Sequence, residues 1–160
     1  MQNIQTTFLH EVEPSKIIDL MNNKMVAKYL PLLKGGFSEQ DCQAFIAAKK
    51  KLWDEHGYGP WAFLVNGEFA GWGGLQPEQG EADFALILHP TYWGLGRKIF
   101  TLVKDKAFNE LGLDSIMALL PPNRHNANAI LRFGFKEEGE LNIGGQVFRK
   151  FRYLKPKMTP

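Results

Sequence analysis

Cysteine is nearly absent from this chain of 160 residues, since Cys42 is the only one. An intrachain disulfide is therefore impossible, and the lone thiol is consistent with a reducing compartment. No apolar run reaches the roughly 18 residues that a membrane-spanning helix needs. The first residues also lack the cationic start and the apolar core of a signal peptide. We therefore expect a cytoplasmic protein with no membrane contact.

A strong excess of one charge is also missing, because 19 basic residues stand against 17 acidic ones and the formal net charge is +2. This balance gives no argument for a nucleic-acid partner. The four histidines show no metal-ligand spacing, so we expect no metal site. With 44% hydrophobic and 22% charged residues, the composition is typical of a soluble globular domain.

The length suits one domain, which at this size buries roughly 70% of its unfolded surface. No repeat, low-complexity segment or composition break divides the chain. We predict one domain over residues 1–155 and a loose tail over residues 156–160. Monomer and homodimer both stay open.

Hydrophobic spacing and turn residues predict a strand, two or three helices, a three-strand meander, and then helix, strand, helix and two strands. Asn66-Gly67 is the strongest hairpin signal, and Ser38 and Asp41 form a capping box before a long helix. This order implies an α+β fold with a mixed sheet of six to seven strands, an antiparallel meander plus a parallel pair, flanked by about four helices. The predicted strands span residues 4–12, 61–65, 68–72, 81–88, 115–120, 136–141 and 146–154.

The chain is organised around residues 83–98, Asp-Phe-Ala-Leu-Ile-Leu-His-Pro-Thr-Tyr-Trp-Gly-Leu-Gly-Arg-Lys. Pro90 ends an apolar strand because it has no N–H to donate, and two glycines then lead into a helix. Glycines let the backbone turn sharply and leave no Cβ between its amides and a ligand. The free N–H groups of the first helical turn, with Arg97 and Lys98 beside them, predict an anion site suited to phosphate or pyrophosphate.

This stretch contains neither Gly-x-x-x-x-Gly-Lys-Ser/Thr nor a complete Gly-x-Gly-x-x-Gly. It resembles instead the pyrophosphate motif of the GNAT superfamily of N-acetyltransferases. That motif has an apolar strand residue, a proline two positions on, an aromatic residue and then Arg/Gln-x-x-Gly-x-Gly/Ala. Leu88, Pro90, Tyr92 and Gly96 fall in register with it, and Gly94 stands where a glycine is common.

A second segment, residues 122–135, extends the resemblance. At this distance the GNAT family has Asn-x-x-Ser/Ala, a short helix and Gly-Phe, and Asn123 and Gly134 match at the family's spacing. Asn amides can cap the helix or hydrogen-bond the amides of a pantetheine arm, and Arg132 can reach a phosphate. The resemblance implies that acetyl-CoA binds between the strand ending at Leu88 and the strand over residues 115–120.

Two positions depart from the first motif, because Trp93 replaces Arg/Gln and Lys98 replaces a small residue. Lys98 can either contact phosphate or crowd the turn. His-Pro-x-Tyr-Trp-Gly-x-Gly looks like the branch that includes the ribosomal-protein N-terminal acetyltransferases. The residues expected to hold acetyl-CoA are Ile87, Leu88, Trp93, Gly94, Leu95, Gly96, Arg97, Lys98, Asn123, Asn126 and Arg132.

The expected reaction needs a base, because the acceptor ammonium (pKa ~8 for an α-amine, ~10.4 for lysine) must lose a proton before attack. A carboxylate, acting directly or through water, is the usual base. The resembled branch often has Glu where Asp83 stands, and Glu81 shares its strand face, so either can act. Backbone amides near Leu88 can polarise the thioester carbonyl.

The acid that protonates the leaving thiolate has no clear candidate. Some family members place a Tyr where Ile130 stands, and the resembled branch often has Ser at the position of Asn126. Asn126 can donate a hydrogen bond but cannot supply a proton, so solvent or another residue is the acid. No Ser or Cys with a base partner is evident, which predicts direct attack with no covalent enzyme intermediate.

We therefore expect an N-acetyltransferase acting on a primary amine. The acceptor can be a protein N-terminus, a polyamine, an amino sugar or another small amine, and the branch resemblance favours the first. The alternative is a non-catalytic acyl-CoA-binding or regulatory module of the same fold. The missing Tyr, Asn126 and Lys98 motivate that alternative.

Overall fold

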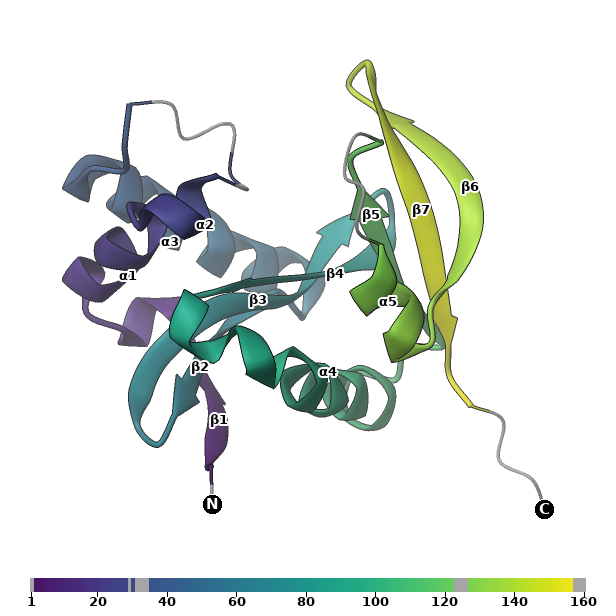
Figure 1. Cartoon of the computed structure of the whole chain (residues 1–160), viewed down its shortest axis with the longest axis horizontal. Helices are drawn as coiled ribbons and strands as arrows, with labels where there is room; N and C mark the ends of the chain where they lie inside the picture. Colours follow the sequence, from purple (N-terminus) through teal and green to yellow (C-terminus); the bar gives the residue numbers. More distant parts are fainter. Residues whose placement is uncertain (1, 29, 31–34, 123–126, 157–160) are drawn as a thin grey trace.

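The computed structural model describes residues 2–28, 30, 35–122 and 127–156. At its centre lies a seven-stranded sheet in the order β1-β2-β3-β4-β5-β7-β6 (Figure 1). Neighbouring strands are antiparallel except β4 and β5, which are parallel. The expected α+β fold, with its meander and its parallel pair, is thus confirmed. The strands are β1 (Ile4–Thr7), β2 (Pro60–Val65), β3 (Glu68–Glu78), β4 (Glu81–Leu88), β5 (Ser115–Leu120), β6 (Lys136–Ile143) and β7 (Gln146–Leu154).

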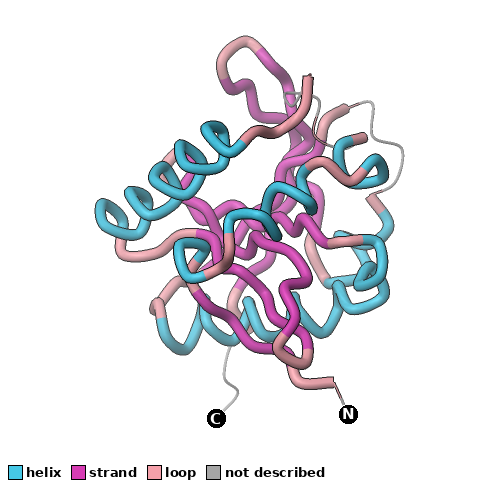
Figure 2. The backbone as a smooth tube through the Cα atoms, turned by 90° about the vertical axis from the view of Figure 1, so that its left-hand side faces the viewer, coloured by secondary structure: helices cyan, strands magenta, loops and turns pink. Residues whose placement is uncertain are grey.

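Helices lie on both faces of the sheet, as the view in Figure 2 shows. The described part of the chain has five α-helices, against about four expected: α1 (Pro14–Met21), α2 (Lys24–Ala27), α3 (Glu39–His56), α4 (Gly96–Asp105) and α5 (Asn128–Phe133). A π-helical turn, Lys106–Glu110, continues α4. Two short 3-10 helices, η1 (Leu9–Glu11) and η2 (Pro90–Leu95), precede α1 and α4. No described helix has both the length and the apolar character to cross a membrane.

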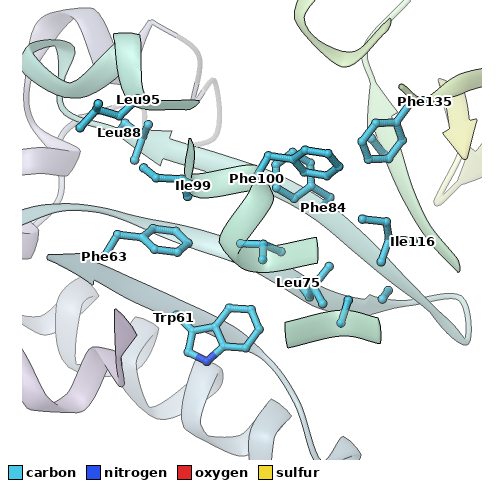
Figure 3. Packing of buried hydrophobic residues seen from close by; sticks show 14 of the residues in the cluster. Trp61, Phe63, Leu75, Phe84, Leu88, Leu95, Ile99, Phe100, Ile116 and Phe135 are labelled. Atoms are coloured by element: carbon cyan, nitrogen blue, oxygen red, sulfur yellow. The ribbon is translucent and has the colours of Figure 1, made fainter. Parts of the chain in front are cut away.

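The alternation of side chains along each strand divides the core into two clusters. The larger one fills the space between the sheet and α4, and Figure 3 shows its packing around Phe63, Leu75, Phe84, Ile99 and Phe100. The smaller one lies under α1 and α3 and includes Ile17, Met21, Phe37, Cys42 and Ala62. Burial raises the pKa of the Cys42 thiol, as expected for a cysteine of the core. Strand β4 contributes to both clusters and lies between the two helical layers.

Several predicted boundaries are confirmed because the residues that set them act locally. The Ser38 hydroxyl accepts from the Asp41 N–H at 3.1 Å, and the Asp41 carboxylate accepts from the Ser38 N–H, which completes the capping box of α3. Gly57 ends that helix with a φ of +78°. Asn66 and Gly67 both have positive φ, as a two-residue hairpin turn requires.

Other boundaries differ from the prediction. Residues 76–78, expected in a turn, belong to β3, because β3 stays paired with β4 down to Glu78↔Glu81. The turn consists of Gln79 and Gly80, whose positive φ values match another two-residue hairpin. The first strand ends at Thr7 instead of continuing to residue 12, and α1 begins at Pro14 with no side-chain cap from Ser15. The predicted loose tail lies, from residue 157 onward, outside the described residues.

Candidate functional site

The turn after β4 is held to that strand by side chains. Nδ1 of His89 accepts a hydrogen bond from the Thr91 backbone N–H at 3.1 Å and caps η2. The indole N–H of Trp93 donates to the carbonyl oxygen of Leu88 at 2.8 Å. The path of the chain from the end of β4 into α4 is therefore fixed at two points.

Helix α4 presents a positive N-terminus at the end of this turn. Leu95 occupies the N-cap position and provides no side-chain hydrogen bond, and the first turn of α4 contains no acidic residue. Arg97 and Lys98 follow directly after Gly96, the first residue of the helix. Backbone N–H groups at a helix start attract anions. The binding of phosphate groups at this helix start stays a prediction.

The two glycines of this turn are not needed for its backbone conformation. Gly96 has a helical φ of −53°, and neither it nor Gly94 is among the described glycines with positive φ. A Cβ at Gly94 would meet no atom within 4 Å, and one at Gly96 would make an ordinary 3.7 Å contact with the Phe133 ring. The prediction of a sharp glycine turn is therefore wrong. The other role expected of these glycines, that a missing Cβ lets a ligand approach the backbone amides, stays a prediction.

The second motif packs against the first. The rings of Phe100 on α4 and Phe133 on α5 are stacked with centroids 4.9 Å apart. The guanidinium of Arg97 lies 5.9 Å from the centre of the Phe133 ring. Arg132 is exposed in the last turn of α5. Helices α4 and α5 thus lie on the same side of the sheet. Asn123 and Asn126, predicted to contact acetyl-CoA, lie outside the described residues.

Strands β4 and β5 are paired at a single position, Asp83↔Met117, although β4 continues to Leu88. The His89 N–H donates to the Ala70 carbonyl of β3 at 2.9 Å. In an antiparallel pair the residues that bond the neighbouring strand alternate with residues whose backbone groups point away. Leu88 and Leu86 therefore direct their N–H and C=O groups toward the β5 side.

Asp83 is a partly buried acid at that one pairing position. Its neighbours in sequence, Ala82 and Phe84, belong to the α4-side cluster, so the side chain of Asp83 faces the α3 side. Burial, and next the charge of Glu78, raise the pKa of Asp83 to about 7, and a hydrogen bond from the Leu119 N–H partly opposes them. Its Oδ1 atom is buried without a hydrogen-bond partner in the described structure.

Glu81, the other predicted base, is engaged in ion pairs. Its carboxylate accepts hydrogen bonds from Arg152 at 2.5 Å and from Lys150 at 2.8 Å. Arg152 also pairs with Glu138 on β6. The Arg152 hydrogen bond, followed by that of Lys150, lowers the pKa of Glu81 to about 2. Glu81 is therefore ionised at neutral pH, and its carboxylate oxygens accept hydrogen bonds from Arg152 and Lys150. Asp83, in contrast, can exchange a proton near pH 7.

Three further residues that were predicted to hold acetyl-CoA pack into the core next to the turn after β4. Leu88 and Leu95 are buried in the α4-side cluster, and Ile87 packs against the α1–α3 cluster. Among the described residues, no group of three or more His, Cys, Asp or Glu side chains has a metal-binding arrangement. Sequence reasoning did not identify His89 as the cap of η2. His-Pro at a strand end was the available signal, since Pro90 stands at the start of the 3-10 helix.

Two surface cavities lie away from this site. One of about 280 Å³ is lined by Phe8, Lys49 and Trp53, among others, and one of about 340 Å³ also includes Phe8 and Trp53. They flank the edge-to-face pair of Phe8 and Trp53, whose centroids are 5.1 Å apart. Neither is lined by Asp83 or by the turn after β4, although Lys49 of the first cavity hydrogen-bonds Gln76, the residue paired with Asp83.

The described structure thus has a mixed seven-stranded sheet in which the parallel strands β4 and β5 are paired at one position, with Arg97 and Lys98 in the first turn of the helix that follows β4. The family model of the acetyltransferase (GNAT) domain matches residues 8–136. The chain therefore belongs to the GNAT acetyltransferase family, as its motifs predict.

Solved structures show the same fold. An acetyltransferase from Agrobacterium tumefaciens superposes with a TM-score of 0.75 at 16% identity, covering 95% of this chain and 91% of that one. The aminoglycoside acetyltransferase AAC(6')-Ib in complex with coenzyme A gives 0.70 at 14% identity, covering 97% and 95%. A protein assigned as a ribosomal-protein-serine acetyltransferase in Vibrio cholerae gives 0.68 at 15% identity, covering 97% and 95%.

Proposed function

We propose that this protein transfers the acetyl group of acetyl-CoA to a primary amine by direct attack, in the cytoplasm. One observation carries the proposal: Asp83, a carboxyl group with a pKa of about 7, stands where β4 and β5 make their single register pair. It faces one side of the sheet, and the start of α4 lies on the other side. A thioester bound between the two strands would meet the base and the phosphate site at its two ends.

The proposed binding of acetyl-CoA uses backbone groups and cations. The first N–H groups of α4, with Arg97 and Lys98, suit its pyrophosphate, and Arg132 on α5 can add a further contact. The N–H groups of Leu86 and Leu88, directed toward β5, suit the thioester carbonyl, whose oxygen gains negative charge during attack. Acetyl-CoA supplies the activated acetyl group as a co-substrate.

The proposed chemistry begins with proton removal. An acceptor ammonium with a pKa of ~8 to ~10.4 must become neutral before attack, and Asp83 takes the proton directly or through water. The amine nitrogen then forms a bond to the acetyl carbon, the carbon–sulfur bond breaks, and the thiolate takes a proton from solvent. Asn126 is proposed to donate a hydrogen bond to that thiolate. The acceptor class that we favour is a protein N-terminus, with a small amine as the alternative.

Calorimetry with acetyl-CoA and a thiol-release assay over a panel of amines test this proposal. The panel contains peptides with free N-termini, the same peptides with blocked N-termini as matched controls, a polyamine and an aminoglycoside. Binding of acetyl-CoA with thiol release on one class of amine supports the proposal. Binding without release on any amine favours the non-catalytic acyl-CoA-binding module, and absence of binding contradicts both.

A further inference from the structure

Lys49 on α3 is a partly buried cation that the proposed chemistry does not use. Its Nζ lies 5.4 Å from the centre of the Phe45 ring and 5.1 Å from that of Trp72. Burial lowers the pKa of Lys49, and in the described structure no carboxylate is within ion-pair distance of it. Its one side-chain hydrogen bond runs to Oε1 of Gln76 at 2.6 Å. Two aromatic rings and one hydrogen bond to β3 thus hold the ammonium group of Lys49 in place.

The hydrogen bond of Lys49 fixes the orientation of the Gln76 amide. An ammonium group only donates, so it selects the oxygen of the amide, and the NH₂ group of Gln76 must point elsewhere. Gln76 on β3 is paired directly with Asp83 on β4, and both side chains face the α3 side. Directly opposed side chains in such a pair begin about 5 Å apart. In the described structure the Gln76 NH₂ group does not bond Oδ1 of Asp83, which has no hydrogen-bond partner, so a water molecule can bridge the two groups.

We propose that Lys49 and Gln76 are positioning residues for proton removal from the acceptor amine, with the Gln76 NH₂ group holding a water molecule beside Asp83. This inference rests on the proposed acetyl transfer. The water accepts a hydrogen bond from Gln76, takes a proton from the acceptor ammonium and passes one of its own protons to the Asp83 carboxylate. One proton moves from nitrogen to carboxylate, the water is regenerated, and the neutral amine attacks.

A merely structural Lys49 would leave kcat unchanged in a variant that folds, so a fall in kcat at an unchanged KM for acetyl-CoA is the readout that separates the two roles. Other charged groups bear on the pH profile of kcat/KM. The charge of Glu78 on β3 raises the pKa of Asp83. Glu81 on β4, Lys150 and Arg152 on β7 and Glu138 on β6 are joined in ion pairs.

Two substitutions test the arrangement with full-length protein. Gln76→Glu keeps an oxygen for Lys49 but removes the N–H donors and adds a negative charge beside Asp83. We expect kcat to fall about tenfold and the limb of the pH profile that reports Asp83 to move to higher pH. Lys49→Met frees the amide, and we expect a similar fall in kcat with the KM for acetyl-CoA unchanged. Lys49→Arg keeps a donor and should retain more activity than Lys49→Met.

Lys50→Met is the matched control, because Lys50 is on the same helix, is exposed and makes only a 3.9 Å ion pair with Asp54. It should behave as wild type. If Lys49→Met does not fold, Gln76→Glu alone decides. Folded variants that keep the wild-type kcat and pH profile overturn this inference while leaving acetyl transfer in place. A wild-type protein that releases no thiol with any amine overturns the proposed function itself.

Discussion

Trp93 donates its indole N–H to the carbonyl oxygen of Leu88, the last residue of β4, at 2.8 Å. The GNAT motif has Arg or Gln at this position. In this protein Trp93 uses the hydrogen bond to fix the turn that leads to the start of α4. Trp93 thus acts on the backbone of the turn, whatever contact it also makes with a ligand.

Trp93→Phe keeps the aromatic ring and removes the N–H. We expect the Kd for acetyl-CoA to rise about tenfold, the equivalent of one hydrogen bond, because the turn is no longer fixed to β4. The exposed position of Trp93 predicts a small change in Tm. Calorimetry measures the Kd, and Thr101→Val on the exposed face of α4 is the control. An unchanged Kd would show that this hydrogen bond does not organise the turn.

The sequence predicted those parts of the site whose residues lie close together in the chain. Strand β4 begins and ends where its apolar run and Pro90 indicate, and the turn into α4 follows from the same stretch. The contact of Arg97 with Phe133 joins residues far apart in the chain, and only the shared family motif indicated that the two segments meet.

The roles of Asp83 and Glu81 could not be separated from the sequence, because both occupy the same face of one strand. The difference comes from β7, which places Lys150 and Arg152 against Glu81, whereas Asp83 is partly buried and has no ion pair in the described structure. Those partners are 69 and 71 residues away along the chain. No periodicity or spacing within β4 carries that information.

Gly94→Ala tests whether the open space at this glycine belongs to a ligand. The added methyl group meets no protein atom within 4 Å, and alanine restricts the unfolded chain more than glycine does. The free energy of unfolding should therefore stay equal or rise by about 0.5 kcal/mol. The Kd for acetyl-CoA should rise at least about fivefold, because the methyl group occupies the approach to the backbone amides.

Gly71→Ala is the contrasting variant, since its Cβ would lie 2.1 Å from the Ile87 carbonyl oxygen and Gly71 has a φ of +157°. It should destabilise the fold directly. Thermal unfolding and calorimetry distinguish the two cases. If Gly94→Ala binds acetyl-CoA as tightly as wild type, the amides of this turn are not the phosphate site.

Glu81→Gln should weaken the fold in a pH-dependent way. The folded state lowers the pKa of Glu81 to about 2 from an ordinary value of 4.5. Its contribution to stability is therefore present above about pH 4.5 and is lost as the pH falls toward 2. The carboxylate is partly exposed, so solvent screening reduces the contribution to the order of 1 kcal/mol.

Urea unfolding of wild type and Glu81→Gln at pH 7 and at pH 3 measures this contribution. The difference between the two proteins should be larger at pH 7. Glu137→Gln, which removes a more exposed pair with Arg149, is the control and should cost less. An equal difference at both pH values would mean that Lys150 and Arg152 do not stabilise the ionised form of Glu81.

Asp83→Asn should lower turnover strongly and leave the affinity for acetyl-CoA nearly unchanged. Loss of a general base typically costs a factor of about 10² to 10⁴ in rate. In wild type, kcat/KM should rise with pH through an inflection near 7, where Asp83 loses its proton. That limb should disappear in the variant, which leaves only the limb of the acceptor amine. An unchanged profile would exclude Asp83 as the base.

Asp83→Asn should also stabilise the folded protein, because the pKa of Asp83 is higher in the folded state than in the unfolded chain. The unfolded chain releases the Asp83 proton near pH 4, whereas the folded state keeps it up to about pH 7. Folded stability therefore falls as the pH rises from about 4 to 7 and then stays level. Asp83→Asn, uncharged at every pH, should raise the free energy of unfolding at pH 8 by up to about 4 kcal/mol and change it little at pH 4. Thermal unfolding at both pH values measures this difference, and an equal change in Tm at both would contradict it. A residue that destabilises the fold at the pH where it is needed for turnover is expected at an active site, where burial sets the proton affinity that the reaction uses.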